Sequence, residues 1–491
     1  MIPKIKDVRL PARLHVTTPL RFDWINEASK SVAIGLESKE SEPKNLIFLG
    51  KINETGTTRS YYNYNLWLAI DFPHIILICG RRGTGKSYTL GVIAEGLSGA
   101  GEVSTIKEKQ YAVLVIDTLG QFWQMKYPPS LDDPYGREQI SLLKRWGLKP
   151  QSLDNIEVYV PKGSNRYFPD WKIFTIRISD LDLDDWCGLL GVDRYYSRMG
   201  QLMSQVYEKV VKKGYTWIKK DLETGSIIQT KHIPPKELYT IDDLIECLDH
   251  DQEINSKIAG FETRTIRALR SRLTDLKTWK VFDKEGSSVA EIFKRGTITV
   301  MNLQDVDYQL KSLVVAILVK KIFKARAEAK AMEEAQKVSK VKNCSKLNTF
   351  PPGWLLVDEA HNYCPEEEIT AAKSWLIRYA KEGRSLGLGL VATTQQPSAL
   401  STKLSSQINI LISHGLAFSQ DVSAVESRLL NDPPDAVRLE YEKVTTNVLR
   451  RILRSLERGD ALISAFGVNR VFSIQVRPRL TMHGGGPPRF A

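Results

Sequence analysis

Cysteine and long apolar runs are both scarce in this sequence. The chain holds five cysteines among 491 residues, and no two of them form a Cys-x-x-Cys pair. An odd, dispersed set of this kind argues against a zinc site and a disulfide scaffold, and it favours a reducing compartment. No stretch reaches the roughly 18 apolar residues that a membrane-spanning helix needs, and residues 1–30 contain no apolar run typical of a signal peptide. We therefore expect a cytoplasmic protein with no membrane partner.

The remaining composition is that of a globular protein with an excess of positive charge. Hydrophobic residues make up 42% of the chain and charged residues 26%, so a sizeable core is available. The length suits about two to four domains. The 69 lysines and arginines exceed the 57 aspartates and glutamates by 12. This net charge suits a nucleic-acid partner, but it can also serve solubility alone, and composition leaves both readings open.

The strongest local pattern is a strand, a glycine-rich loop and a helix in direct succession. Ile75–Cys79 predicts a buried strand, Gly80–Ser87 matches Gly-x-x-x-x-Gly-Lys-[Ser/Thr], and a helical pattern runs from Tyr88 to about Leu97. Glycines let the backbone curl so that its N–H groups cradle a phosphate, and the helix start adds partial positive charge. The flanking strand and helix disfavour a glycine-rich turn that binds nothing.

Two side chains of this loop have expected roles of their own. Lys86 can reach the β- and γ-phosphates of a nucleotide, and the Ser87 hydroxyl can hold Mg²⁺. The residues expected to hold the nucleotide are Gly80, Arg82, Gly83, Thr84, Gly85, Lys86, Ser87 and Tyr88.

A second chemical cluster follows another apolar run. The strand predicted at Trp354–Val357 ends in Asp358-Glu359-Ala360-His361. Beside a phosphate loop, Asp358 can complete the Mg²⁺ shell opposite Ser87, and Glu359 can orient or deprotonate an attacking water. His361 and the asparagine after it either cap the chain locally or sense the nucleotide.

Three more polar residues lie at the ends of predicted strands. Gln395 follows the strand Leu388–Thr393, where its amide can contact the γ-phosphate or the lytic water. Arg384 precedes that strand at its far end, so it either reaches a neighbouring subunit's nucleotide as a transition-state charge clamp or forms a surface ion pair. Asp117 follows the strand Ala112–Ile116, and it is either a site residue at the ligand-binding edge of the sheet or the cap of a turn.

The order of these patterns predicts an α/β fold with a mostly parallel sheet flanked by helices. We expect a small β-rich domain over residues 1–70 and a nucleotide-binding core in two parts, 71–127 and 296–480. Residues 128–295 have mainly helical periodicity and predict an insertion, although Ile156–Pro161 and Ile173–Ile178 can still be sheet strands. Residues 481–491 lack a core-forming pattern and are expected to form a C-terminal tail.

One predicted helix of the insertion carries a basic stripe. Within Phe261–Trp279, the side chains of Arg264, Arg267 and Arg270 lie along one side. This stripe either tracks phosphates, faces a neighbouring subunit or is a solvated helix face.

Together these segments resemble the HerA branch of the HerA/FtsK family of ring-forming, DNA-pumping ATPases. The resemblance covers roughly residues 66–488, and the segments that carry it are His74–Ser87, Ile116–Gly120, Leu356–Asn362, Glu382–Arg384 and Thr394–Ser398. It implies a RecA-like P-loop NTPase core, ATP and Mg²⁺ as ligands, a homohexamer with ATP sites between subunits, and double-stranded DNA in a central channel. It also implies ATPase roles for Lys86, Asp358, Glu359 and Gln395 in their own subunit, and an arginine-finger-like role for Arg384.

The resemblance leaves two functions open. Family members often work with a partner nuclease, in DNA end processing or antiphage defence, so the first hypothesis is a DNA translocase or helicase motor. The second is an ATPase scaffold that regulates a partner effector, with DNA movement secondary. Asp358-Glu359-Ala360-His361 also suggests a superfamily-2 helicase, but the sequence contains neither the Ser-Ala-Thr nor the Gln-x-x-Gly-Arg motif of that class.

Overall fold

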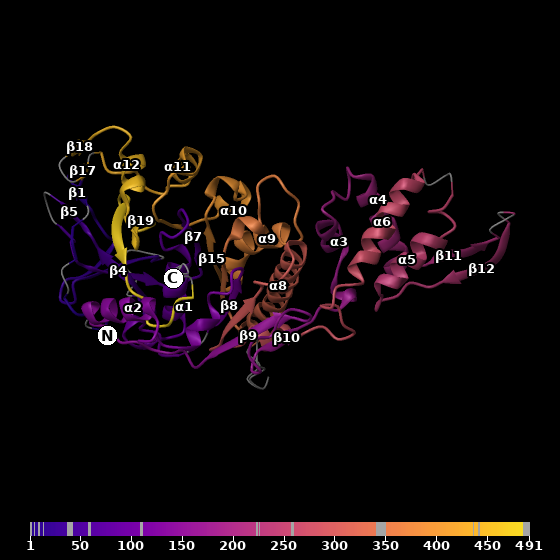
Figure 1. Ribbon diagram of the computed structural model, residues 1–491, viewed down its shortest axis with the longest axis horizontal. Helices are drawn as coiled ribbons and strands as arrows, with labels where there is room; N and C mark the ends of the chain where they lie inside the picture. Colours follow the sequence, from indigo (N-terminus) through magenta and orange to yellow (C-terminus); the bar gives the residue numbers. More distant parts are fainter. Residues whose placement is uncertain are drawn as a thin grey trace.

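A single large sheet organises the chain. The computed structural model describes residues 2–484 except 4, 8–9, 13, 37–42, 57–59, 109–110, 222–223, 225, 257–259, 340–349, 436 and 440–441, so most of the predicted tail lies outside the described residues. The sheet has 14 strands (Figure 1), and eight consecutive ones are parallel. In sheet order these are β10 (Lys172–Phe174), β9 (Ile156–Pro161), β13 (Ile298–Asn302), β8 (Ala112–Asp117), β14 (Gly353–Val357), β15 (Leu388–Thr394), β7 (Ile75–Cys79) and β16 (Ile410–Ser413).

This parallel half confirms the predicted α/β core. The strand before the glycine-rich loop, β7, lies between β15 and β16, and β15 separates it from β14, the strand that ends at Asp358. Because the carboxyl ends of parallel strands meet at one edge, the loop after β7 and the acids after β14 are brought to the same side. The segment predicted at Ile156–Pro161 is indeed a sheet strand.

Helices cover both faces of the parallel half. The alternate residues of β7 divide between two cores, with Leu77 and Cys79 in one and Ile76 and Ile78 in the other. Helices α1 (Lys86–Leu97) and α2 (Pro134–Trp146) pack on the Ile76 face, and α8 (Tyr308–Ser339) and α9 (Lys373–Glu382) on the Leu77 face. Shorter helices are α7 (Val289–Ile292), α10 (Thr402–Ser405), α11 (Ser419–Glu426) and α12 (Val448–Ser455).

Residues 1–70 are rich in strands, as expected, but those strands extend the main sheet. Its second half runs β19 (Asp460–Ala465), β20 (Phe472–Val476), β4 (Leu46–Ile52), β6 (Asn65–Ala69), β3 (Ser31–Ile34) and β2 (Trp24–Asn26). Every residue of β4 is buried, so this strand needs a neighbour on each edge and cover on each face. A second sheet joins β18 (Glu442–Val444), β17 (Val437–Leu439), β1 (Leu14–Val16) and β5 (Glu54–Gly56).

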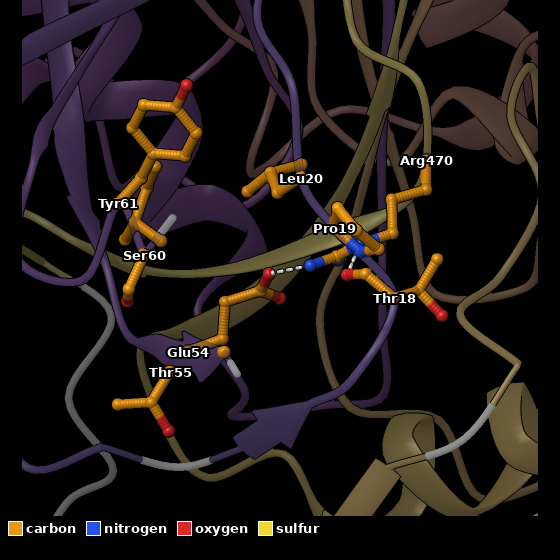
Figure 2. Close-up of a pocket in the computed structure, with 10 residues that line it drawn as sticks. Thr18, Pro19, Leu20, Glu54, Thr55, Ser60, Tyr61 and Arg470 are labelled. Carbon is orange, nitrogen blue, oxygen red and sulfur yellow. Dashed lines mark hydrogen bonds and ion pairs between the residues drawn. The ribbon is translucent and has the colours of Figure 1, made fainter. Parts of the chain in front are cut away.

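A buried ion pair fastens the N-terminal segment to the C-terminal strands (Figure 2). Arg470 pairs with Glu54 at 2.6 Å, and its Nε donates to the carbonyl of Thr18 at 3.0 Å. Burial raises the pKa of the Glu54 carboxyl, although Arg470 opposes that rise. Removing either partner would leave a buried charge uncompensated, which is strongly destabilising.

The segment 128–295 is an insertion only in part, because its α2, β9 and β10 belong to the main sheet and the helices that cover it. The rest of the segment forms a lobe at one end of the molecule, away from the N-terminal strands (Figure 1). It contains α3 (Leu183–Leu190), α4 (Arg198–Glu208), α5 (Ile241–His250) and α6 (Thr263–Leu276), plus a hairpin of β11 (Tyr215–Lys220) and β12 (Ile227–Ile233) that we did not predict. Lys320 of α8, which is buried, holds the lobe through Asp182 at 2.6 Å and through Asp185.

Helix α6 carries four arginines, namely the three of the predicted stripe and Arg272. Arg270 pairs with Asp249 at 2.9 Å, and Arg272 donates to the carbonyl of Leu190 at 2.7 Å, so these two serve the lobe itself. Arg264 and Arg267 are exposed.

In the part of the chain that the structure describes, no helix is both long and apolar enough to cross a bilayer.

Candidate nucleotide-binding and hydrolysis site

The loop after β7 has the backbone that a phosphate cradle requires. Gly80, Gly83 and Gly85 all have positive φ angles, of 154°, 79° and 122°. A Cβ atom on Gly80 would lie 2.7 Å from the Cβ of His414, whereas one on Gly83 would meet nothing within 4 Å. The loop is therefore packed on its inner side and open at Gly83, so it can admit a phosphate group to its N–H groups.

Lys86 and Ser87 begin α1 directly after this loop. Lys86 is buried, and its Nζ donates to the carbonyl of Arg81 at 3.0 Å. Burial lowers the pKa of Lys86, while the charges of Glu359 and Asp358 oppose that shift. The charges of both acids therefore act on the ammonium group.

The loop is supported from behind by the ends of β16 and β19. Arg81 N–H donates to the carbonyl of Gly415 at 2.9 Å, and Gly459 N–H donates to that of Thr84 at 3.2 Å. The imidazole of His414 lies beneath the loop and is fully buried.

The hydrogen bonds of His414 fix its tautomer. Nδ1 lies 2.8 Å from the carbonyl of Asp460 and so must donate to it, which leaves Nε2 to accept from the Thr89 hydroxyl at 2.9 Å. Burial lowers the pKa of His414 to about 4, so the ring is neutral. This neutral ring connects α1 to β19.

Asp358 meets Ser87 across the intervening strand. Its Oδ1 accepts from the Ser87 hydroxyl at 3.1 Å and from the Thr393 hydroxyl at 2.8 Å. Its Oδ2 is buried with no hydrogen-bond partner among the described residues. Burial and the charge of Glu359 raise the pKa of Asp358 to about 7. A hydroxyl beside a carboxylate with an unused oxygen is an oxygen-donor set that suits Mg²⁺.

Glu359 is held from several directions. Its backbone is in the left-handed region, with φ 53° and ψ 53°, and its N–H donates to the Thr393 hydroxyl at 3.0 Å. Its carboxylate accepts from the side-chain amide of Gln395 and from the Gln395 N–H at 3.3 Å. His361 Nδ1 lies 3.5 Å from the same carboxylate. A non-glycine residue in this conformation, fixed by its neighbours, is a feature concentrated at functional sites.

Asp117 is the cap of a turn. Its two carboxylate oxygens accept from Gln121 N–H at 2.9 Å and Phe122 N–H at 2.8 Å. The carboxyl is fully buried, and this burial raises its pKa to about 6 although the turn's N–H groups oppose the rise. Of the two alternatives that the sequence left open, the structure gives Asp117 the capping role.

Three predicted site residues lie apart from the acids. Arg384 is exposed in a 3₁₀ turn (Gly383–Leu386) before β15, and its charge acts on His74 at the start of β7, which is the edge opposite the phosphate loop. Arg82 is exposed within the loop. Tyr88 turns toward the C-terminal segment, where its hydroxyl accepts from Arg479 N–H at 2.7 Å.

Two residues important to this geometry were not predicted. Thr393 joins Asp358 to the Glu359 backbone, and His414 supports the loop. The only sequence signal for Thr393 was a pair of threonines ending a buried apolar strand, directly before Gln395. His414 follows the strand β16 at the same edge of the sheet.

Comparison with known proteins identifies relatives of the chain. A family model described as the central domain of the helicase HerA matches residues 65–322. The DNA double-strand break repair helicase HerA of Pyrococcus furiosus is 25% identical over 345 residues, which cover 67% of this chain and 54% of that protein. The protein of the same name from Sulfurisphaera tokodaii is 27% identical over 160 residues, 33% of this chain and 27% of that protein. The chain therefore spans about half or less of these relatives' lengths.

Two solved structures are similar to the chain at low sequence identity. The plasmid coupling protein TrwB, in complex with ADP and Mg²⁺, matches with a TM-score of 0.47 and 16% identity, covering 84% of this chain and 86% of that one. VirB4 of Thermoanaerobacter pseudethanolicus matches with a TM-score of 0.45 and 14% identity, covering 88% and 96%.

Proposed function

The chain belongs to the HerA helicase family, whose central-domain model matches its residues 65–322, and from this we propose that it is an ATP-driven motor acting on double-stranded DNA. One observation carries the proposal. The Ser87 hydroxyl of the phosphate loop lies 3.1 Å from the carboxylate of Asp358, and Glu359 follows it with its carboxylate fixed by Gln395. This is the arrangement that P-loop ATPases use to hold a metal-bound triphosphate and activate water.

Each side chain of the site has a proposed task. Lys86 would neutralise the terminal phosphates, and Ser87 with Asp358 would hold Mg²⁺, which supplies charge neutralisation between the β- and γ-phosphates. Glu359 would accept a proton from the attacking water, with Gln395 and His361 holding its carboxylate in place. Gly80, Gly83, Thr84 and Gly85 would supply the backbone cradle and Arg82 its outer contact. Tyr88, whose side chain is turned toward the C-terminal segment, would contribute through its backbone N–H alone.

Arg384 belongs to a ring in this proposal. Because it lies at the sheet edge opposite its own phosphate loop, it would act on the nucleotide of an adjacent subunit as a transition-state clamp. A homohexamer with DNA through its centre would provide such neighbours. The excess of 12 positive charges would support contact with the DNA backbone.

Both relatives are named as DNA double-strand break repair helicases, so we propose that this motor works with a partner nuclease or effector, in DNA end processing or antiphage defence. The alternative is an ATPase scaffold that assembles and regulates such an effector, with DNA movement secondary. The two differ in one respect, since only a motor needs to couple hydrolysis to DNA.

The test is steady-state ATP hydrolysis with and without linear duplex DNA. We expect wild-type hydrolysis to rise with duplex, Lys86→Ala to lose nucleotide affinity, and Glu359→Gln to bind ATP while turnover falls by at least about a hundredfold, because the catalytic proton acceptor is gone. Equal hydrolysis with and without duplex would favour the scaffold. Full turnover by Glu359→Gln would contradict the assignment of the base.

A further inference from the structure

The helix that begins at Lys86 has one face shaped for the C-terminal segment. Tyr88, Gly91 and Glu95 lie at spacings of three and four residues, so they line one side of α1. Residues 477–483, which we name the strap, leave β20 and cross this side. The contacts between strap and helix are polar and almost entirely buried.

Glu95 is the centre of these contacts. Its carboxylate is fully buried and accepts four hydrogen bonds from the strap. Oε2 accepts from Arg477 at 2.7 Å and from Leu480 N–H at 3.1 Å, and Oε1 accepts from Thr481 N–H at 3.0 Å and the Thr481 hydroxyl at 2.7 Å. Burial alone would raise the pKa of Glu95, but Arg477, Arg479 and Thr481 together lower it. The carboxylate is therefore charged and depends on the strap for its partners.

Gly91 makes room for a second buried arginine. A Cβ atom at this position would lie 2.7 Å from the guanidinium carbon of Arg479. The guanidinium donates to the Thr481 hydroxyl at 3.0 Å and to the carbonyl of Met482 at 3.1 Å. Glycine is intrinsically unfavourable inside a helix. At this position it leaves the space that the Arg479 side chain occupies.

The last contact reaches the residue next to the proposed Mg²⁺ ligand. Arg479 N–H donates to the Tyr88 hydroxyl at 2.7 Å, and the Tyr88 ring packs edge-on against His483 with ring centroids 5.1 Å apart. Tyr88 directly follows Ser87. The strap thus contacts α1 at Glu95 and again at Tyr88, in the first turn of the helix, beside Lys86 and Ser87.

We propose that the strap is a positioning element for the phosphate loop, so that strap docking and ATP binding stabilise each other. The inference rests on the proposed function, because it assumes that the loop binds ATP. If the strap leaves α1, the buried Glu95 loses its partners, and α1 must shift or hydrate to relieve the charge. Any such shift moves Lys86 and Ser87, which are part of the same rigid helix. By linkage, ATP bound at the loop must then favour the docked strap.

The test combines ATP binding with hydrogen exchange on the full chain. Thr481→Val removes the hydroxyl that bridges Glu95 and Arg479 at nearly constant volume, and Thr481→Ser restores it. We expect Thr481→Val to weaken Mg²⁺–ATP binding by about threefold to tenfold and to speed exchange in residues 477–483, with Thr481→Ser close to wild type. ATP should slow exchange of the strap in the wild-type chain. Gly91→Ala, which displaces Arg479, should behave like Thr481→Val.

Ser98→Ala is the matched control, because its hydroxyl donates to the Glu95 carbonyl at the end of the same helix without touching the strap. It should leave ATP affinity unchanged. Faster strap exchange in Thr481→Val with unaltered ATP affinity would overturn the coupling and leave the proposed function standing. A wild-type chain that binds no ATP would overturn both.

Discussion

At the residue scale, Asp117 shows how burial converts a capping residue into a pH-dependent one. Its carboxyl has a pKa of about 6 in the folded chain, against an ordinary aspartate value of 3.8. Between these values the folded chain keeps a proton that the unfolded chain releases. The free energy of unfolding therefore falls as pH rises from about 4 to about 6, by on the order of 3 kcal/mol from this group.

Replacing this carboxyl should flatten the pH dependence. Asp117→Asn carries no titrating proton, but it can accept only one of the two N–H bonds that the aspartate accepts, so it should be less stable than wild type at every pH. We expect the gap in melting temperature to be widest near pH 4 and to narrow toward pH 6.5, in thermal unfolding measured across that range. An exposed neighbour, Asp132→Asn, serves as the control. A gap that stays constant with pH would contradict the assigned proton.

Some residues of the candidate site could be predicted from the sequence and others could not. Lys86, Ser87, Asp358, Glu359 and Gln395 were predicted because each follows an apolar run at a fixed offset, and the structure brings them together. By contrast, Thr393 was not predicted. Its hydroxyl bonds to Asp358 and to the Glu359 N–H, which follow the neighbouring strand β14, and no local sequence pattern indicates a contact between strands. The nucleotide that Arg384 is expected to contact is bound by another subunit.

At the element scale, α1 packs so closely against β4 that replacing a helical glycine by alanine should not stabilise the chain as it usually does. Gly96 lies against β4, and a Cβ atom there would be 2.6 Å from the Cβ of Ile47. Glycine to alanine in a helix normally gains about 1 kcal/mol. Overpacking a core costs about 1–3 kcal/mol, and here the backbone of a buried strand must yield.

We therefore expect Gly96→Ala to lower stability by up to about 2 kcal/mol net. Thermal unfolding should show a lower melting temperature than wild type, while Ser98→Ala at the end of the same helix should change it little. A melting temperature equal to or above that of wild type would mean that α1 and β4 can separate without cost, contrary to the packing described above.

Elements were predictable where the chain carries a strong local pattern. The strands β7 and β14 are apolar runs followed by glycine or acid, β15 is an apolar run that ends in two threonines, and α1 follows a recognised loop. The hairpin of β11 and β12 was missed because six of the seven residues of β12 are exposed, so its sequence lacks the alternation of a half-buried strand. One edge of β4 pairs with β20, more than 400 residues away, which no local pattern can indicate.

At the scale of the whole molecule, the proposed role of Arg384 would make activity a property of the assembly. If this arginine completes the site of an adjacent subunit, a ring containing a few Arg384→Ala subunits loses more sites than its fraction of mutant chains suggests. We expect hydrolysis of mixed samples to fall more steeply than the wild-type fraction. Assembly mass, measured by light scattering with ATP and DNA, should be unchanged.

The matched control is Arg378→Ala, an exposed arginine of the nearby helix α9 that pairs with Glu382 at 3.0 Å. Mixtures containing this variant should keep activity close to wild type. Activity strictly proportional to the wild-type fraction in Arg384→Ala mixtures would exclude a role between subunits and leave the surface ion pair that the sequence also allowed.

The pairing of β4 with β20 sets the order in which this chain can fold during synthesis. Ile52 lies opposite Ile474, so a ribosome must add more than 400 residues before one edge of a fully buried strand meets its neighbour. Until then that edge offers unpaired N–H and C=O groups to any other chain nearby. A chain that ends before β20 would therefore keep one edge of β4 unpaired, and this edge could pair with another chain and aggregate.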